Sequence, residues 1–177
     1  MISKDFKRRR DFLLSKIEDN SIAFLFSGLE KSRNNDVNYK FRQSSNFFYL
    51  TGINNPSMLL VITKISNRHS TTLVCDRPND IDKIWHGQIP SKSSYKNQFE
   101  IQNVLYFDEL KSLELNDAKN IYFEFADENR LNQFIDNLNL SQPQSRYLRN
   151  NNSRSTKIDL SNLIFDMRRI KSKSEVS

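Results

Sequence analysis

The residues from Tyr39 to Gly52 constrain the fold of this chain more than any other stretch, because they are its most aromatic part. Five of these fourteen residues are Tyr or Phe, and a Thr-Gly pair closes the run. Aromatic side chains bury large areas, so a run this dense predicts an anchor of the hydrophobic core, with most of its rings packed inside. Arg42 stands among them, and its guanidinium has to be paired, stacked or solvated at its tip.

Apolar runs and turn signals along the chain predict alternating helices and strands. A capping serine and helical spacing of apolar residues predict a first helix over Ser3 to Glu18. Short apolar runs predict strands at 21–26, 58–62, 71–75, 104–107 and 121–125, and an amphipathic pattern predicts a helix over 127–138. The polar turn 66–69 indicates a hairpin, and residues 27–38 are predicted to form a long loop. This order of elements predicts an α/β fold, a mixed β-sheet flanked by helices.

Positive charge is concentrated toward the two ends of the chain, and the net charge is +6. The first predicted helix carries the triplet Arg8, Arg9 and Arg10, which helical geometry spreads over different faces. We expect a solvated surface there, with a phosphate site as the alternative. A basic balance can also serve nucleic acid, but no nucleic-acid-binding motif accompanies it, so we expect no nucleic-acid partner.

The length and the cysteine count restrict the class of protein further. A chain of 177 residues suits one domain with a proper core. Its single cysteine, Cys75, excludes an internal disulfide and fits a reducing compartment. No apolar run has the length of a signal peptide, and none approaches the about 18 residues of a membrane helix. We therefore expect a cytoplasmic protein without a membrane partner.

The residues that usually carry catalysis are too scattered here to predict a complete active site. The two histidines, His69 and His86, have no second His or Cys at ligand spacing, which argues against a metal site. Cys75 ends an apolar run, so we interpret it as a small buried residue, with a nucleophile as the alternative. The acidic pairs, such as Asp108-Glu109 and Asp127-Glu128, coincide with predicted helix starts, where negative charge is favourable. The sequence thus predicts no catalytic residue and no metal ligand.

Trp85, the single tryptophan, leaves two interpretations open. It lies in the sequence Ile84-Trp85-His86-Gly87, at the end of a predicted helix. A tryptophan there either packs on the sheet as a core residue or is exposed for an interface or a ligand. Asp36 and Arg42, which flank the start of the aromatic run, are most simply a surface charge and a structural ion pair.

Several of these segments, taken together, carry a family resemblance. They are the Phe-Lys-Arg-Arg-Arg helix, the strand Ile-Ala-Phe-Leu-Phe-Ser, Asp36, the aromatic run 39–52, Pro56, Asp76-Arg77, Ile84-Trp85, Gly87 and the segment 166–172. In this order they resemble the N-terminal part of bacterial Xaa-Pro aminopeptidases (aminopeptidase P), and the resemblance covers essentially the whole chain. The aromatic run is its most specific part.

The resemblance implies a fold and a division of labour. It implies the creatinase/prolidase N-terminal fold, an α/β unit of ribonuclease H-like type, over residues 1–170, with 171–177 beginning a linker to a catalytic domain. That domain would hold a dinuclear manganese centre with two Asp, one His and two Glu, and would release the residue that precedes proline. Neither the ligand set nor the activity is expected in this chain alone. Its expected partners are its own catalytic domain, neighbouring subunits of a homo-oligomer and the peptide substrate.

The resemblance also implies which residues reach the substrate cleft of the parent enzyme. Trp85 matches through its Ile-Trp-x-Gly setting, and Asp36 through its place before Tyr-x-x-Arg-Gln. An arginine after the helix of Leu131 contributes in the family, and Arg146 is the better placed candidate, with Arg154 as the alternative. The sequence therefore predicts a non-catalytic domain that supports assembly and walls a cleft. A free-standing interaction module is the first alternative, and a basic nucleic-acid-binding domain the second.

Overall fold

A computed structural model describes residues 3–34, 37–66, 68–78, 90–113, 118–141 and 155–171 of the chain. The elements in order are α1 (Ser3–Lys16), β1 (Ser21–Phe26), β2 (Ser32–Asn34), β3 (Val37–Asn38), α2 (Ser45–Thr51), β4 (Leu59–Ile65), β5 (Arg68–Cys75), α4 (Lys92–Phe99), β6 (Asn103–Tyr106), the 3₁₀ helix η1 (Phe107–Ser112), β7 (Asn120–Phe123), the 3₁₀ helix η2 (Phe125–Asp127), α5 (Glu128–Ser141), β8 (Thr156–Asp159) and α7 (Ser161–Arg169). All the strands predicted above and both predicted helices are confirmed, within a few residues at their ends.

A six-stranded mixed sheet organises the molecule, in the order β6-β5-β4-β1-β7-β8. Among its described strands, β4 alone runs antiparallel to the others, pairing with β1 on one side and β5 on the other. The β4–β5 pair is the hairpin that the polar turn at 66–69 predicted. The C-terminal ends of the five parallel strands therefore lie on one side of the sheet, which is called the carboxyl edge below. These strands are β1, β5, β6, β7 and β8.

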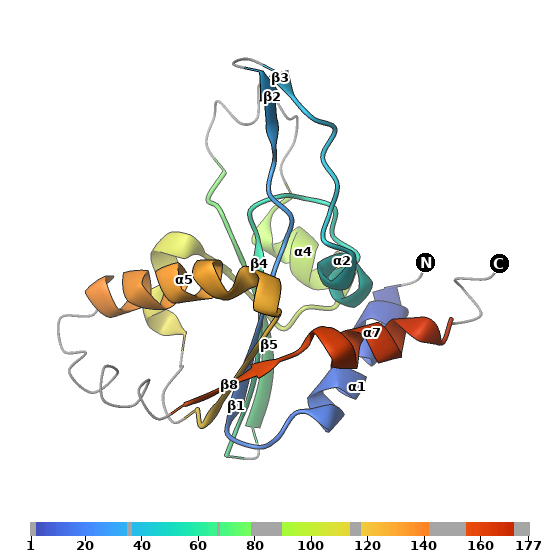
Figure 1. Cartoon of the computed structure of the whole chain (residues 1–177), viewed down its shortest axis with the longest axis vertical. Helices are drawn as coiled ribbons and strands as arrows, with labels where there is room; N and C mark the ends of the chain where they lie inside the picture. The colour runs from blue at the N-terminus through green and yellow to red at the C-terminus, as the bar shows by residue number, and fades with distance from the viewer. Residues whose placement is uncertain are drawn as a thin grey trace.

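Helices cover both faces of this sheet, as Figure 1 shows. Strand β1 illustrates the separation, because its side chains alternate between two cores. Ala23 and Leu25 pack with α1, α2, α4 and α7. Ile22, Phe24 and Phe26, which alternate with them, pack with α5. The predicted fold class, a mixed sheet flanked by helices, is confirmed.

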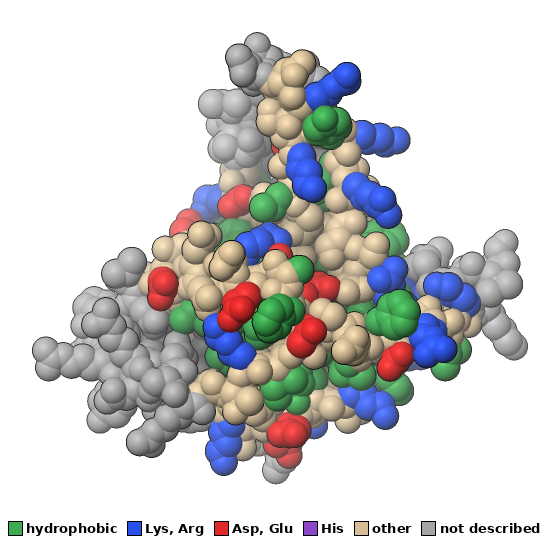
Figure 2. All heavy atoms as spheres, viewed as in Figure 1, with side chains coloured by type: hydrophobic (Ala, Val, Ile, Leu, Met, Phe, Trp, Pro, Cys, Tyr) green, Lys and Arg blue, Asp and Glu red, His purple; other side chains and the backbone are tan. Residues whose placement is uncertain are grey.

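The sequence predicts a loop over 27–38, but Ser32–Asn34 and Val37–Asn38 within it form a two-stranded ribbon. Ser32 faces Asn38 across the β2–β3 pair, and the Tyr39 backbone N–H donates to the Lys31 carbonyl at 2.9 Å. The ribbon projects from the body of the molecule (Figure 1), and basic side chains gather on it (Figure 2). Lys31, Arg33, Lys40 and Arg42 are all exposed, so Arg42 is solvated.

The second half of the aromatic run folds into the short helix α2, which buries one face only. The Ser44 side chain accepts from the Phe47 N–H at the start, and Gly52 ends the helix in the left-handed region at φ 73°. Helical periodicity turns Phe47 and Leu50 into the core but leaves Phe48 exposed. Tyr39 is exposed as well. The run does anchor the core, but the expectation that most of its rings are buried is wrong.

The prediction that the triplet Arg8, Arg9 and Arg10 forms a solvated surface is correct for Arg8 only, because Arg9 and Arg10 are buried. Arg8 is 68% exposed and pairs with Asp5 at 3.4 Å, as expected of a surface residue. Arg10 is only 1% exposed. Its guanidinium donates to the Leu50 carbonyl at 2.8 Å, and to the carbonyls of Phe99 and Glu100 at 2.9 Å each. Burial lowers the pKa of Arg10 to about 10, so it remains charged at neutral pH.

The three carbonyls that Arg10 reaches stand at the ends of two helices. Leu50 lies in the last turn of α2, while Phe99 ends α4 and Glu100 is its cap. Carbonyls at the end of a helix lack intrahelical donors and carry partial negative charge, which a cation satisfies. Arg9 does the same beside it, because its Nη1 donates to the Tyr49 carbonyl at 3.0 Å. Two arginines of α1 therefore hold α2 and α4 against α1.

We predict that Arg10→Met lowers the free energy of unfolding by about 3 kcal/mol, because it leaves buried carbonyls without donors. Arg8→Met, two positions earlier on the same helix, is the matched control and should change it by less than about 0.5 kcal/mol. Urea unfolding followed by circular dichroism measures both. Equal small effects would show that Arg10 contributes no more than a surface arginine.

Candidate functional site

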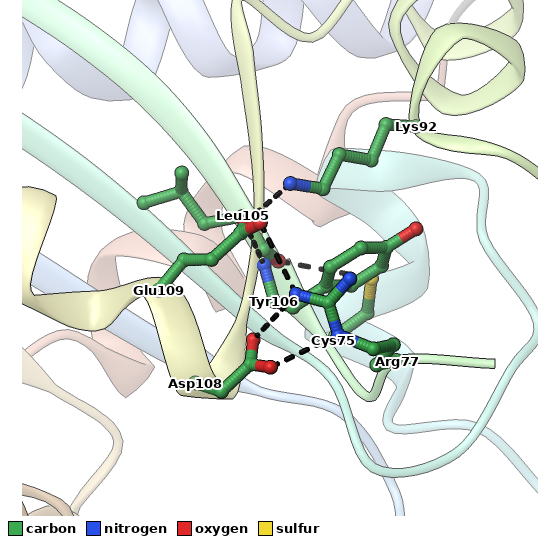
Figure 3. A network of polar contacts seen from close by, with 7 residues as sticks. All are labelled: Cys75, Arg77, Lys92, Leu105, Tyr106, Asp108 and Glu109. Atoms are coloured by element: carbon green, nitrogen blue, oxygen red, sulfur yellow. Dashed lines mark hydrogen bonds and ion pairs between the residues drawn. The ribbon is translucent and has the colours of Figure 1, made fainter. Parts of the chain in front are cut away.

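The cleft residues predicted from the sequence all lie outside the described residues. This applies to Asp36, Trp85, Arg146 and the alternative Arg154. Trp85 belongs to residues 79–89, and the residues on either side of this range are described. Two of them, Arg77 and Lys92, meet at the carboxyl edge of the sheet, where Figure 3 shows a network of polar contacts around Tyr106. This network is the candidate site.

The network is built on two neighbouring parallel strands. Cys75 ends β5 and pairs in register with Tyr106, which ends β6. Arg77 leaves the sheet two residues after Cys75, and its guanidinium carbon lies 4.4 Å from the centre of the Tyr106 ring. Its Nε donates to Asp108 Oδ2 at 2.9 Å and its Nη2 to Asp108 Oδ1 at 3.2 Å. This two-pronged ion pair fixes the chain just before the Trp85 segment.

Lys92 makes the matching contacts on the other side of that segment. Its ammonium lies 4.1 Å from the centre of the same Tyr106 ring and bonds to Glu109. Glu109 also accepts the Tyr106 backbone N–H at 3.0 Å. The Lys92 hydrogen bond, helped by that N–H, lowers the pKa of Glu109. Arg77, which precedes residues 79–89, and Lys92, which follows them, thus contact one aromatic ring. Both also pair with the adjacent carboxylates of Asp108 and Glu109.

A cavity of about 240 Å³ opens beside this network. The described residues that line it include Glu30, Asn55, Cys75, Arg77, Tyr95 and Tyr106, together with Pro78 and Pro90. Pro78 directly precedes the Trp85 segment and Pro90 directly follows it. Tyr95 is 2% exposed, and no hydrogen-bond partner for its hydroxyl lies among the described residues. The cavity is therefore lined by the described residues on both sides of 79–89, and it has a buried hydroxyl on its wall.

The side chains of the site favour a structural role over a catalytic one. Burial raises the pKa of the Cys75 thiol to about 11 and that of Tyr95 to about 12, so both stay protonated at neutral pH. Cys75 is buried, as predicted. The charges of Arg77 and Lys92 are balanced by Asp108 and Glu109. Within the described ranges, no three His, Cys, Asp or Glu side chains are grouped so as to hold a metal ion, and no helix could cross a membrane.

Sequence reasoning missed this network. Arg77 and Asp108 are 31 residues apart, and each charge had a simpler local interpretation. The acidic pair Asp108-Glu109 was assigned to a helix start, which is correct, since both lie in the first turn of η1. What the sequence does not show is that parallel pairing of β5 and β6 brings the Asp76-Arg77 pair to the same place.

Comparison with known proteins places this geometry in a family context. The model of a family described as the aminopeptidase P N-terminal domain matches residues 6–122. The chain is 27% identical to the Xaa-Pro aminopeptidase of Escherichia coli K12, over 98% of this chain and 40% of that protein. It is 38% identical to the Xaa-Pro aminopeptidase of Haemophilus influenzae over an 86-residue stretch, 48% of this chain and 20% of the relative.

Solved structures agree. Aminopeptidase P from E. coli superimposes with a TM-score of 0.85 and 25% identity, covering 99% of this chain and 41% of that one. Proline aminopeptidase P II from Yersinia pestis gives a TM-score of 0.84 and 26% identity, with the same coverage. The chain thus spans about two fifths of the length of these relatives.

The raised pKa of Cys75 predicts slow and strongly pH-dependent thiol reactivity. At pH 8 a thiol with a pKa of about 11 carries about a hundredth of the thiolate of a free cysteine with a pKa near 9. We expect Ellman's reagent to modify the folded chain at least about 100-fold more slowly than the urea-unfolded chain. The rate for the folded chain should still rise about tenfold between pH 9 and pH 10, whereas that for the unfolded chain rises less than about twofold there and then levels off. A plateau below pH 9 in the folded chain would contradict the prediction.

Proposed function

Because this chain belongs to the aminopeptidase P N-terminal domain family, we propose that it is the non-catalytic N-terminal domain of a Xaa-Pro aminopeptidase. The parent enzyme would release the residue that precedes proline, and a dinuclear manganese centre in a C-terminal domain would supply the attacking hydroxide. In this proposal the chain contributes no metal ligand and no catalytic group. Its tasks are assembly of the oligomer and part of the wall of the substrate cleft.

The contacts of Arg77 and Lys92 with the Tyr106 ring, called the Tyr106 clamp below, are the observation that supports the cleft role best. Arg77 and Lys92, which lie on either side of residues 79–89 in the sequence, both contact the Tyr106 ring, so the described residues that flank Trp85 are anchored at one point. A cleft wall has to be held in place before the substrate arrives, because ordering it afterwards costs binding energy. Balanced charges around the clamp suit such a support, since they leave no net attraction for the substrate at that point.

The proposed partition of roles has a direct biochemical test. Purified residues 1–177 should not hydrolyse a Xaa-Pro peptide with added manganese, whereas the gene product that continues past Ser177 should do so. Turnover is measured by release of the N-terminal amino acid. Turnover by the purified 177-residue chain would overturn the assignment of catalysis to another domain.

Trp85→Ala in the full-length enzyme should lower kcat/KM for peptides longer than a dipeptide about fivefold, with little change in melting temperature, because it trims the cleft wall. Arg77→Met should have an effect of the same direction, since it releases one end of the same segment. Lys157→Met is the matched control. Lys157 forms an ion pair with Glu128, with 3.0 Å between Nζ and Oε1, and takes no part in the Tyr106 network. A fall in melting temperature in place of the kinetic effect would make Trp85 a core residue.

A further inference from the structure

The cavity beside the Tyr106 network has a buried polar group on its wall that the fold leaves unsatisfied. This group is the hydroxyl of Tyr95, which is 2% exposed and has no hydrogen-bond partner among the described residues. A buried hydroxyl without a partner destabilises the folded state, so such groups are uncommon unless water or a ligand satisfies them. Tyr95 lines the cavity of about 240 Å³. A polar group that enters this cavity is therefore the candidate partner of the Tyr95 hydroxyl.

One wall of the cavity is held in shape by a side chain from behind it. The Gln43 side chain donates to the Asn55 carbonyl at 2.8 Å and accepts the Gly28 N–H at 2.6 Å. Residues 55–58, which follow from this anchor, all line the cavity. A cavity with such a wall is preformed, so a ligand that fills it meets a small ordering cost.

Rigid apolar groups supply much of the remaining lining. The rings of Pro56, Pro78 and Pro90 have almost no rotamer freedom to lose when a ligand packs on them. Met58 and the ring of Tyr106 add further apolar surface. The volume of about 240 Å³ lies below the about 300–1,000 Å³ of sites for drug-sized molecules. The cavity therefore suits a small molecule with an apolar body.

The charges of the described lining favour a cation. The lining has two carboxylates, those of Glu30 and Asp76, and one guanidinium, that of Arg77. Arg77 is already paired with Asp108 and Glu109, neither of which is among the described residues that line the cavity (Figure 3). Because the charge of Arg77 is neutralised from outside, the carboxylates of the lining determine its electrostatic character.

The contacts of Glu30 and Asp76 agree with a negative cavity. Glu30 accepts a hydrogen bond from Nδ2 of Asn38 at 3.2 Å, and this neutral donor does not cancel the carboxylate charge. Burial raises the pKa of the Cys75 thiol to about 11, and the charge of Asp76 adds to the rise. Cys75 lines the cavity as well, so the field of Asp76 reaches the cavity wall. A cation is thus attracted into this space and an anion is repelled.

We propose that this cavity binds a small organic amine in its protonated form. The ammonium group donates to the Tyr95 hydroxyl within the negative field of Glu30 and Asp76, and the apolar body of the amine packs on the proline rings. An ammonium group is a donor only, and a tyrosine hydroxyl can accept, so the two are complementary. The residues of the site all belong to this chain, so binding needs no catalytic domain.

Three probes of similar size and different charge test the proposal on the 177-residue chain. They are benzylamine, which is protonated at pH 7, benzyl alcohol and benzoate. Benzylamine should bind with a Kd of about 1 mM, as expected of a ligand this small, and at least about tenfold more tightly than the other two. In an NMR titration the amide signals of Met58 and Cys75 should move, whereas that of Ile164 in α7 should not. No binding, equal affinity for the three probes or shifts away from the cavity would overturn the proposal.

Tyr95→Phe tests the buried hydroxyl. This variant should bind benzylamine at least about threefold more weakly without a lower melting temperature, because the hydroxyl has no bond within the described fold to lose. Tyr122→Phe is the matched control, since Tyr122 is also buried but its hydroxyl accepts the Glu18 N–H at 3.4 Å and does not line the cavity. It should bind benzylamine like the unchanged chain. Unchanged affinity or a lower melting temperature in Tyr95→Phe would show that the hydroxyl does not serve a ligand.

Glu30→Gln tests the charge, because it keeps the shape of the side chain and removes the carboxylate. The preference for benzylamine over benzyl alcohol should fall at least about threefold. Glu18→Gln is the matched control, since Glu18 accepts from Asn120 at 3.0 Å outside the cavity, and it should keep the preference. If the two variants behave alike, the lining does not select the ligand by charge, and the proposal fails. None of these outcomes depends on whether a longer enzyme hydrolyses Xaa-Pro peptides.

Discussion

The buried guanidinium of Arg10 is the interaction on which one whole layer of this fold depends. The helices α2 and α4 are seven and eight residues long, lengths at which a helix has little stability of its own. Each ends with carbonyls that face inward, and Arg10 satisfies carbonyls of both with one planar fork. A lysine could not reach all three with the same geometry. Burying this charge is costly, but the donors are matched by acceptors at negative helix ends, which offsets much of the desolvation.

The sheet and the helices packed on it support two different surfaces. On the helical layer, Arg9 lies next to Arg10 and stacks on Tyr49, so the contacts that close the core also line the surface hollow between α1, α2 and α7. At the carboxyl edge, the register of β5 with β6 sets Cys75 beside Tyr106 and thereby determines where Arg77 leaves the sheet. In the proposed function, the domain affects catalysis by presenting such surfaces to another part of the protein.

The sequence predicted what local patterns determine and missed what long-range contacts decide. Strand β1 and the β4–β5 hairpin were predictable because their apolar runs and turn are contiguous. The burial of Arg9 and Arg10 was not, because the carbonyls they satisfy belong to residues 40 to 90 positions away. The burial of Phe48 is predicted wrongly because the run forms a helix at this point, and only one face of that helix, the one with Phe47 and Leu50, is turned toward the core. The candidate cleft residues came from the family resemblance and not from any pattern, and they fall outside the described residues, so they remain predictions.

The positions of the charged side chains change how the net charge of +6 is interpreted. Arg9 and Arg10 are internal and act on helix ends, and Arg77 and Lys92 are neutralised by the carboxylates of η1. Among the described residues, exposed cations remain on several elements: Lys31 and Arg33 on or beside the β2–β3 ribbon, Lys7 and Lys16 on α1, and single residues elsewhere, such as Arg68, Lys96, Lys119 and Lys157. A continuous basic stripe, which a nucleic-acid backbone requires, does not follow from such a distribution. The proposed function needs no such stripe, since local groups of cations suffice to steer an acidic protein surface.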